Sequence, residues 1–128
     1  MGHKVLVVDD DQTIRTILHD YMESLGFEIF HATDGRQGWE IFQEQQPNLV
    51  IADIFMPEMT GVELLEKIKA SDAPVPVVLI SGVPLSQSEI QMQRERADGF
   101  LEKPYMFWQM KELISKLVPD VVPPPAKE

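Results

Sequence analysis

The sequence contains no cysteine, and none of its apolar runs reaches the ~18 residues that a membrane helix needs. Without cysteine the chain forms no disulfide and no thiolate metal site. Because disulfides are typical of secreted proteins, their absence gives no support to secretion. The N-terminal residues enter a strand pattern within three positions, so no signal peptide fits there. We therefore expect a soluble, cytoplasmic protein.

Basic residues are also scarce, since 11 lysines and arginines stand against 21 acidic residues and the formal net charge is −10. This balance disfavours direct binding to nucleic acid or to an anionic membrane, and it favours cations or basic partners. With 128 residues, of which 44% are hydrophobic, the chain is large enough for one domain. We predict a domain over residues 1–118 and a proline-rich linker or C-terminal tail over residues 119–128.

Five times along the chain, a short apolar run is followed by a helical pattern. The runs that predict strands are residues 4–8, 28–32, 49–52, 77–80 and 99–101. Three of the helices begin at capping-box sequences, which are Asp34-x-x-Gln37, Thr60-x-x-Glu63 and Ser86-x-x-Glu89. The helix after the third strand is predicted to bury Val62, Leu65 and Ile68, whereas the next one has few apolar residues and should pack loosely. The pattern predicts an α/β fold of the (βα)5 type, a doubly wound parallel five-stranded sheet with helices on both faces.

Every predicted strand except the second delivers a polar residue near its carboxyl end. These residues are Asp9, Asp10 and Asp11 after the first strand, Asp53 after the third, Ser81 after the fourth and Lys103 after the fifth. Because the carboxyl ends of parallel strands gather along one edge of a sheet, we expect these side chains to meet in one crevice. Asp11 is interpreted as the N-cap of the first helix rather than as a metal ligand.

The residue types in this crevice indicate metal-assisted phosphoryl transfer. Several carboxylates stay close together only when a cation offsets their repulsion or when their pKa values rise. Oxygen ligands without histidine or cysteine suit Mg²⁺, with Mn²⁺ as an alternative. Asp53 can act as the nucleophile, because carboxylates form acyl phosphates. A bound metal and Lys103 would neutralise the charge that develops on the moving phosphoryl group, and Ser81 would donate a hydrogen bond to it.

Four motifs stand at these strand ends, namely Val7-Val8-Asp9-Asp10, Asp53-x-x-Met56-Pro57-x-x-x-Gly61, Ser81-Gly82 and Phe100-x-x-Lys103-Pro104. In this order the chain resembles the receiver domain of two-component response regulators, the family of the bacterial chemotaxis regulator, over about residues 4–117. The resemblance implies the flavodoxin-like strand order 2-1-3-4-5. The residue roles that it implies are Asp9, Asp10, Asp53 and the backbone carbonyl of Phe55 as Mg²⁺ ligands, Asp53 as phosphoacceptor, Ser81 as hydroxyl switch, Phe100 as the aromatic whose ring moves, and Lys103 as the invariant lysine, joined to Pro104 by a typically cis bond.

Three further residues bear on how long a phosphoryl group would survive on Asp53. Gly82 stands where the family mostly has a small residue, which leaves room for the incoming group. Phe55 and Val83 each stand two residues after a site residue and flank the path of a hydrolytic water. Both are apolar and Phe55 is bulky, so we hypothesise that they slow loss of the phosphoryl group.

The function that the resemblance implies is a phosphorylation-controlled signalling switch, not a metabolic enzyme, since the domain catalyses only its own phosphorylation and slow dephosphorylation. A sensor histidine kinase or phosphotransfer protein would donate its phosphoryl group from a phosphohistidine to Asp53. The new charge would draw in Ser81 and let Phe100 turn inward. It would change the surface formed by the helix that begins at Ser86, the strand at residues 99–101 and the last helix. That surface would contact an output domain or protein, and a homodimer on activation is an alternative use of it.

Two other classes of function share the topology. A flavodoxin-like binding module would place its flavin phosphate against clustered carboxylates, which disfavours that interpretation. A metal-dependent phosphohydrolase would need a second acid two residues after Asp53, where this chain has Phe55.

The remaining residues of interest have no role in that crevice. The three histidines, His3, His19 and His31, show no ligand spacing and are predicted to lie at the surface or rim. Trp108 falls on the outward side of the last helix, where it is either partly packed or an anchor for a partner.

Overall fold

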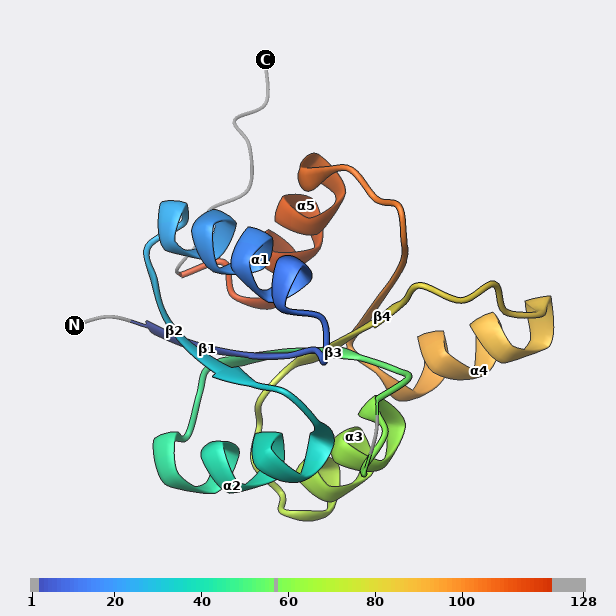
Figure 1. The fold of residues 1–128 in the computed structure, drawn as a ribbon, viewed down its shortest axis with the longest axis horizontal. Coiled ribbons are helices and arrows are strands. Elements are labelled where there is room, and N and C mark those ends of the chain that lie inside the picture. The colour runs from blue at the N-terminus through green and yellow to red at the C-terminus, as the bar shows by residue number, and fades with distance from the viewer. Residues whose placement is uncertain (1–2, 57, 121–128) are drawn as a thin grey trace.

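In the computed structural model, which describes residues 3–56 and 58–120, five parallel strands form one sheet in the order β2-β1-β3-β4-β5 (Figure 1). The strands are β1 His3–Val8, β2 Phe27–Ala32, β3 Leu49–Asp53, β4 Val77–Ser81 and β5 Gly99–Glu102. The helices are α1 Gln12–Ser24, α2 Gly35–Gln45, α3 Gly61–Ala70, α4 Gln87–Arg96 and α5 Phe107–Leu117. The predicted fold and strand order are confirmed, while Pro57 and tail residues 121–128 lie outside the described residues.

The alternation of side chains along the buried strands creates two hydrophobic cores, one on each face of the sheet. In β1, Leu6 and Val8 join the core under α2, α3 and α4, whereas Val5 and Val7 join the core under α1 and α5. Figure 1 shows α1 and α5 together on one side of the sheet and α2 with α3 on the other. Because both faces are covered, the central strands are apolar throughout, and only their ends are free to carry polar groups.

Helix starts follow the predicted capping sequences closely. Thr60 and Ser86 each accept a hydrogen bond from the backbone of the glutamate three residues on, and that glutamate bonds back to the cap backbone. In α2, Asp34 accepts from the Gln37 backbone at 2.8 Å, but the Gln37 side chain reaches the backbone of Thr33 instead. Two of the three predicted boxes are therefore complete, and the third is half formed.

The buried face of α3 differs from the predicted one. Its buried apolar side chains are Leu64, Leu65 and Ile68, whereas Val62 is only partly buried. The cause is Gly61, whose backbone N–H donates to the Ile54 carbonyl at 2.9 Å and whose missing side chain leaves room for the Asp53 carbonyl. This close approach turns positions 61, 64, 65 and 68 toward the sheet, and it fixes α3 directly after the strand that ends in Asp53.

Helix α4, all of whose residues are described, has no buried residue, and Met92 is 47% exposed. Its C-terminal end is tied to α3 by Arg96, which donates to Glu66 at 3.2 Å. Just beyond that end, the Asp98 carboxylate bonds Lys69 at 2.7 Å and the Val77 backbone at 2.8 Å. The loose packing predicted for this helix agrees with the structure.

None of the helices in the described ranges combines the length and the apolar character that a membrane crossing requires.

Candidate functional site

Three carboxylates meet at the carboxyl ends of β1 and β3. Asp9, Asp10 and Asp53 each offer one oxygen, and these oxygens all lie within 4.8 Å of one another. Asp9 is buried, Asp53 is half-buried and Asp10 is exposed, so the cluster opens to solvent on one side. The crevice predicted from the parallel topology is therefore present.

Asp9 is held in place by the first turn of α1. Its carboxylate accepts the backbone N–H of Asp11 at 2.9 Å, and its carbonyl accepts a hydrogen bond from the Arg15 guanidinium at 2.7 Å. Asp11 itself caps α1, because its side chain accepts the backbone N–H groups of Thr13 and Ile14. Its carboxylate is thus committed to the helix, in agreement with its interpretation as an N-cap.

Lys103 is the cation of the cluster. Its ammonium lies 3.3 Å from an Asp9 oxygen and 3.5 Å from an Asp53 oxygen. The register of β5 on β4 places it there, since the Lys103 backbone N–H donates to the Ser81 carbonyl at 2.8 Å. The peptide bond from Lys103 to Pro104 is cis.

The Asp53 carboxylate is in an environment that disfavours its charge. Burial raises its pKa, and this effect outweighs the hydrogen bond from the Phe55 backbone at 3.1 Å and the attraction of Lys103, which lower it. The neighbouring Asp9 raises it further. An ionised Asp53 therefore gains more from a second cation than Lys103 alone provides.

The donor set of the cluster fits Mg²⁺. It consists of carboxylate oxygens on one open-sided crevice, with no imidazole or thiolate among the clustered ligands. Mg²⁺ prefers one or two carboxylates and keeps several waters, and an open side leaves space for them.

Ser81 and its two successors line the next part of the crevice. The Ser81 hydroxyl donates to the Val83 carbonyl at 2.7 Å and accepts the Val83 backbone N–H at 3.2 Å. A side chain on Gly82 would meet the Lys103 stem at 3.3 Å, so glycine leaves that space open. Phe55 and Val83, each two residues after a site residue, are 46% and 50% exposed.

Phe100 and Trp108 lie farther from the carboxylates. Phe100 is 5% exposed, and its ring lies 5.7 Å from the Arg94 guanidinium of α4. Its side chain is therefore already inward in this structure. Trp108 is 63% exposed and lines the same surface cavity as Phe100 and Arg94, so its outward position is confirmed.

The structure adds contacts that the sequence pattern did not indicate. Arg15 supports Asp9, and the spacing from the Asp11 cap to Arg15 was the available signal for it. Tyr105 is partly buried near Asp9, and burial together with this carboxylate raises its pKa to about 12. His19 and His31, predicted to show no ligand spacing, are in direct contact with one another.

Known proteins resemble the chain over nearly its whole length. Residues 5–117 match the family model described as response regulator receiver domain. The chain is 34% identical over 117 residues to the chemotaxis protein CheY of Bacillus subtilis, covering 91% of this chain and 98% of that protein. It is 29% identical over 123 residues to sporulation initiation phosphotransferase F of the same organism, covering 93% and 96%. A crystal structure of a response regulator receiver domain protein from Clostridium thermocellum matches with a TM-score of 0.82 at 28% identity, covering 92% and 95%.

The raised pKa of Asp53 makes a prediction about stability. The folded chain binds the Asp53 proton more tightly than the unfolded chain, so the ionised carboxylate lowers stability once the pH rises through its raised pKa. Asp53→Asn should therefore increase the free energy of unfolding at neutral pH in metal-free buffer, and the gain should disappear under acid conditions. Urea denaturation at both pH values measures this difference.

Asp72→Asn, in an exposed turn at the opposite end of the sheet, is the matched control and should change little. A loss of stability in Asp53→Asn at neutral pH would mean that its ion pair with Lys103 outweighs the cost of burial.

Proposed function

The chain belongs to the family of response regulator receiver domains, whose common function is to accept a phosphoryl group on an aspartate, and from this premise we propose that Asp53 is the phosphoacceptor. The observation that carries the proposal is the position of Asp53, half-buried beside two more carboxylates and 3.5 Å from the Lys103 ammonium. The donor is the phosphohistidine of a sensor histidine kinase or of a phosphotransfer protein. A cytoplasmic location stays a prediction.

The transfer is a substitution at phosphorus. An Asp53 oxygen forms the new bond to phosphorus, the bond from phosphorus to the donor imidazole breaks, and the released imidazole takes up a proton. Lys103 stabilises charge on the phosphoryl oxygens as they arrive, because its ammonium already faces the Asp53 carboxylate. Asp9 and Asp10, with Asp53 and the Phe55 carbonyl, would hold Mg²⁺, and the bound ion supplies charge neutralisation to the phosphoryl oxygens.

Ser81 is the proposed switch. Its hydroxyl is bonded on both its donor and acceptor sides to the Val83 backbone. Donation to a phosphoryl group on Asp53 would break the bond to the Val83 carbonyl and release the segment that leads to α4. Because α4 has no buried residue, few apolar contacts oppose its displacement.

The output surface in this proposal is formed by α4, β5 and α5. Phe100 is already inward in this structure, so the proposal gives the larger part of the change at this surface to α4. A shift of α4 would instead move Arg94 away from the Phe100 ring and change the cavity that both share with Trp108. Trp108 would anchor an output domain or protein there, with a homodimer of phosphorylated chains as the second use of the surface.

The other functional classes fit the site less well. A flavin phosphate would meet three carboxylates, and a phosphohydrolase would need an acid where Phe55 stands. The proposed activity is therefore limited to self-catalysed phosphorylation and slow dephosphorylation.

Intact-mass measurement after incubation with a small-molecule phosphodonor and Mg²⁺ tests the central assignment. The wild-type chain should gain one phosphoryl group, and Asp53→Asn should gain none, because an amide oxygen is a poor nucleophile toward phosphorus. Asp72→Asn is the matched control and should behave as wild type. Equal uptake by wild type and Asp53→Asn would refute the assignment of Asp53.

Phe55 should set the lifetime of the phosphorylated state. Its exposed apolar ring stands at the rim of the site, so we expect it to hinder the hydrolytic water. Phe55→Asn should accelerate loss of the phosphoryl group severalfold, measured as phosphate release after the donor is removed. Phe55→Leu keeps an apolar side chain and should stay close to wild type, and an unchanged rate in Phe55→Asn would disprove the hypothesis.

Trp108 should report the change of the output surface. The chain has two tryptophans, so Trp39→Phe leaves Trp108 as the sole indole. Addition of phosphodonor and Mg²⁺ to this variant should change the fluorescence of Trp108, because α4 movement alters the cavity that it lines. The doubly substituted Trp39→Phe, Asp53→Asn chain should show no change. If both chains showed the same change in fluorescence, the change would not be caused by phosphorylation of Asp53, and the prediction would be wrong.

A further inference from the structure

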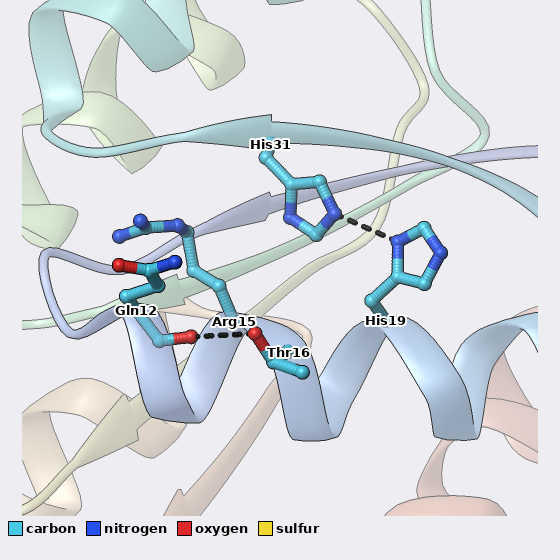
Figure 2. A pocket seen from close by; sticks show the side chains of 5 residues that line it. All are labelled: Gln12, Arg15, Thr16, His19 and His31. Carbon is cyan, nitrogen blue, oxygen red and sulfur yellow. Dashed lines mark hydrogen bonds between the residues drawn. The ribbon is translucent and has the colours of Figure 1, made fainter.

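His19 in α1 and His31 in β2 lie in contact on the face of the sheet away from α2 and α3. His19 Nδ1 lies 2.8 Å from His31 Nε2, and Figure 2 shows the two rings pointing toward one another from the helix and the strand. The ring centroids are 5.0 Å apart with an interplanar angle of 22°, so at this nitrogen–nitrogen distance the rings meet edge to edge. The absence of ligand spacing along the chain gave no sign of this contact, while the predicted position at the surface or rim agrees with the partial burial of both rings.

The two facing nitrogens share one hydrogen. In the neutral pair only one of them carries a hydrogen, which it donates to the lone pair of the other. If both carried a hydrogen, two N–H groups would oppose each other at 2.8 Å. The contact therefore brings two imidazole nitrogens from separate, fixed elements to a point where a proton now lies.

An open cavity of about 410 Å³ lies beside this contact. Its lining consists of Gln12, Arg15, Thr16, His19 and His31, all drawn in Figure 2. The volume is many times the ~30 Å³ that a water molecule occupies in the liquid. A metal ion held by the two nitrogens would thus have space for water ligands.

We propose that His19 Nδ1 and His31 Nε2 form a binding site for a divalent transition-metal ion such as Zn²⁺, separate from the acidic cluster. Metal–nitrogen bonds of about 2.0–2.1 Å at angles between about 90° and 109° place two ligand nitrogens about 2.8–3.4 Å apart. The observed 2.8 Å lies at the lower end of this range. Because the lone pairs now point along the line between the nitrogens, each ring must turn by roughly 35–45° toward the cavity to direct both at one ion. Imidazole suits Zn²⁺ and disfavours Mg²⁺, which separates this site from the carboxylate cluster.

Coordination rearranges one hydrogen without changing the charge of the pair. In the ring that donates, the hydrogen moves from the facing nitrogen to the outer nitrogen by exchange with water, while the other ring keeps the hydrogen that its outer nitrogen already carries. On His19 this outer nitrogen, Nε2, lies 3.8 Å from the Glu23 carboxylate, which is too far for a hydrogen bond but near enough to attract a positively charged centre. On His31 the outer Nδ1 is buried and has no hydrogen-bond partner in the described part of the chain, so that ligand is not reinforced.

The electrostatic surroundings act in both directions. Burial, His19 and Arg15 lower the pKa of His31, so its ring is uncharged at neutral pH, as a metal ligand must be. Arg15 also repels a metal ion, although its guanidinium is directed to the Asp9 carbonyl at 2.7 Å. Glu23 and the net charge of −10 attract a cation. These opposing charges favour a moderate affinity for the metal ion. Substitution of Arg15 should therefore raise that affinity, and substitution of Glu23 should lower it.

Isothermal titration with Zn²⁺, with Mg²⁺ in excess to occupy the acidic cluster, tests the site. Wild type should bind one Zn²⁺ per chain, and both His19→Gln and His31→Gln should lose this binding. His3→Gln removes the third histidine and should bind as wild type. Asp10→Asn should also retain the site, because it weakens only the acidic cluster.

Two further variants distinguish the pair from nonspecific binding. Glu23→Gln should weaken Zn²⁺ binding by less than about tenfold, because it removes a negative charge beside His19 without breaking a hydrogen bond. Arg15→Met should tighten it by removing a positive charge. In nuclear magnetic resonance spectra, Zn²⁺ should shift the ring signals of His19 and His31 and leave those of His3 in place.

The zinc proposal can be wrong while the proposed function is right, and the two outcomes are distinguishable because phosphoryl uptake is measured separately from Zn²⁺ binding. Circular dichroism and phosphoryl uptake with Mg²⁺ should be unchanged in both glutamine variants, which shows that they fold. If wild type binds no Zn²⁺ under excess Mg²⁺, or if His19→Gln binds it equally well, the pair holds only a proton and the proposal is wrong.

Discussion

The ion pairs of Lys103 with Asp9 and Asp53 are the interactions on which the site depends. Three carboxylates share one crevice, Asp9 is almost fully buried, and a single ammonium lies between two of them. An unpaired buried carboxylate is strongly destabilising, so the cluster exists only where the sheet can deliver that lysine. The pairing of β5 with β4 does so through the bond from the Lys103 backbone to Ser81. The remaining negative charge leaves the crevice suited to a cation and, with it, to a phosphoryl group.

Much of this arrangement could be predicted from the sequence, because it follows from local patterns and topology. Apolar runs and capping residues locate the strands and helices, and parallel strands bring Asp9, Asp53, Ser81 and Lys103 to the same edge. The face of α3 was predicted less well, since Val62 and Leu64 are equally apolar and only the close approach of Gly61 to the strand decides between them. Such a contact is set by tertiary packing and leaves no periodic signal.

Tertiary packing is also the reason why the sequence did not predict the contact between the two histidines or the inward position of Phe100. His19 and His31 meet because α1 crosses β2 at one angle, which no spacing along the chain encodes. Phe100 was expected to turn inward on phosphorylation, but its ring is already buried against the core. The structure shifts attention to Ser81, whose hydroxyl has one set of partners in the Val83 backbone and would gain another in a phosphoryl group. In the proposed switch, these two alternative hydrogen-bonding states are what a phosphoryl group would have to favour differently.

The capping box of α4 has a consequence for the mechanics of the switch. The Ser86 side chain accepts the Glu89 backbone N–H and the Glu89 side chain accepts that of Ser86, both from within the helix itself, and no residue of α4 is buried in the core. The helical hydrogen bonds therefore do not depend on where α4 rests against the sheet. Displacing it changes a few ion pairs and side-chain contacts, such as those of Arg96 and Arg94, but breaks no backbone hydrogen bond inside the helix. If phosphorylation displaces α4 as proposed, the helix could therefore change position while keeping its own backbone hydrogen bonds.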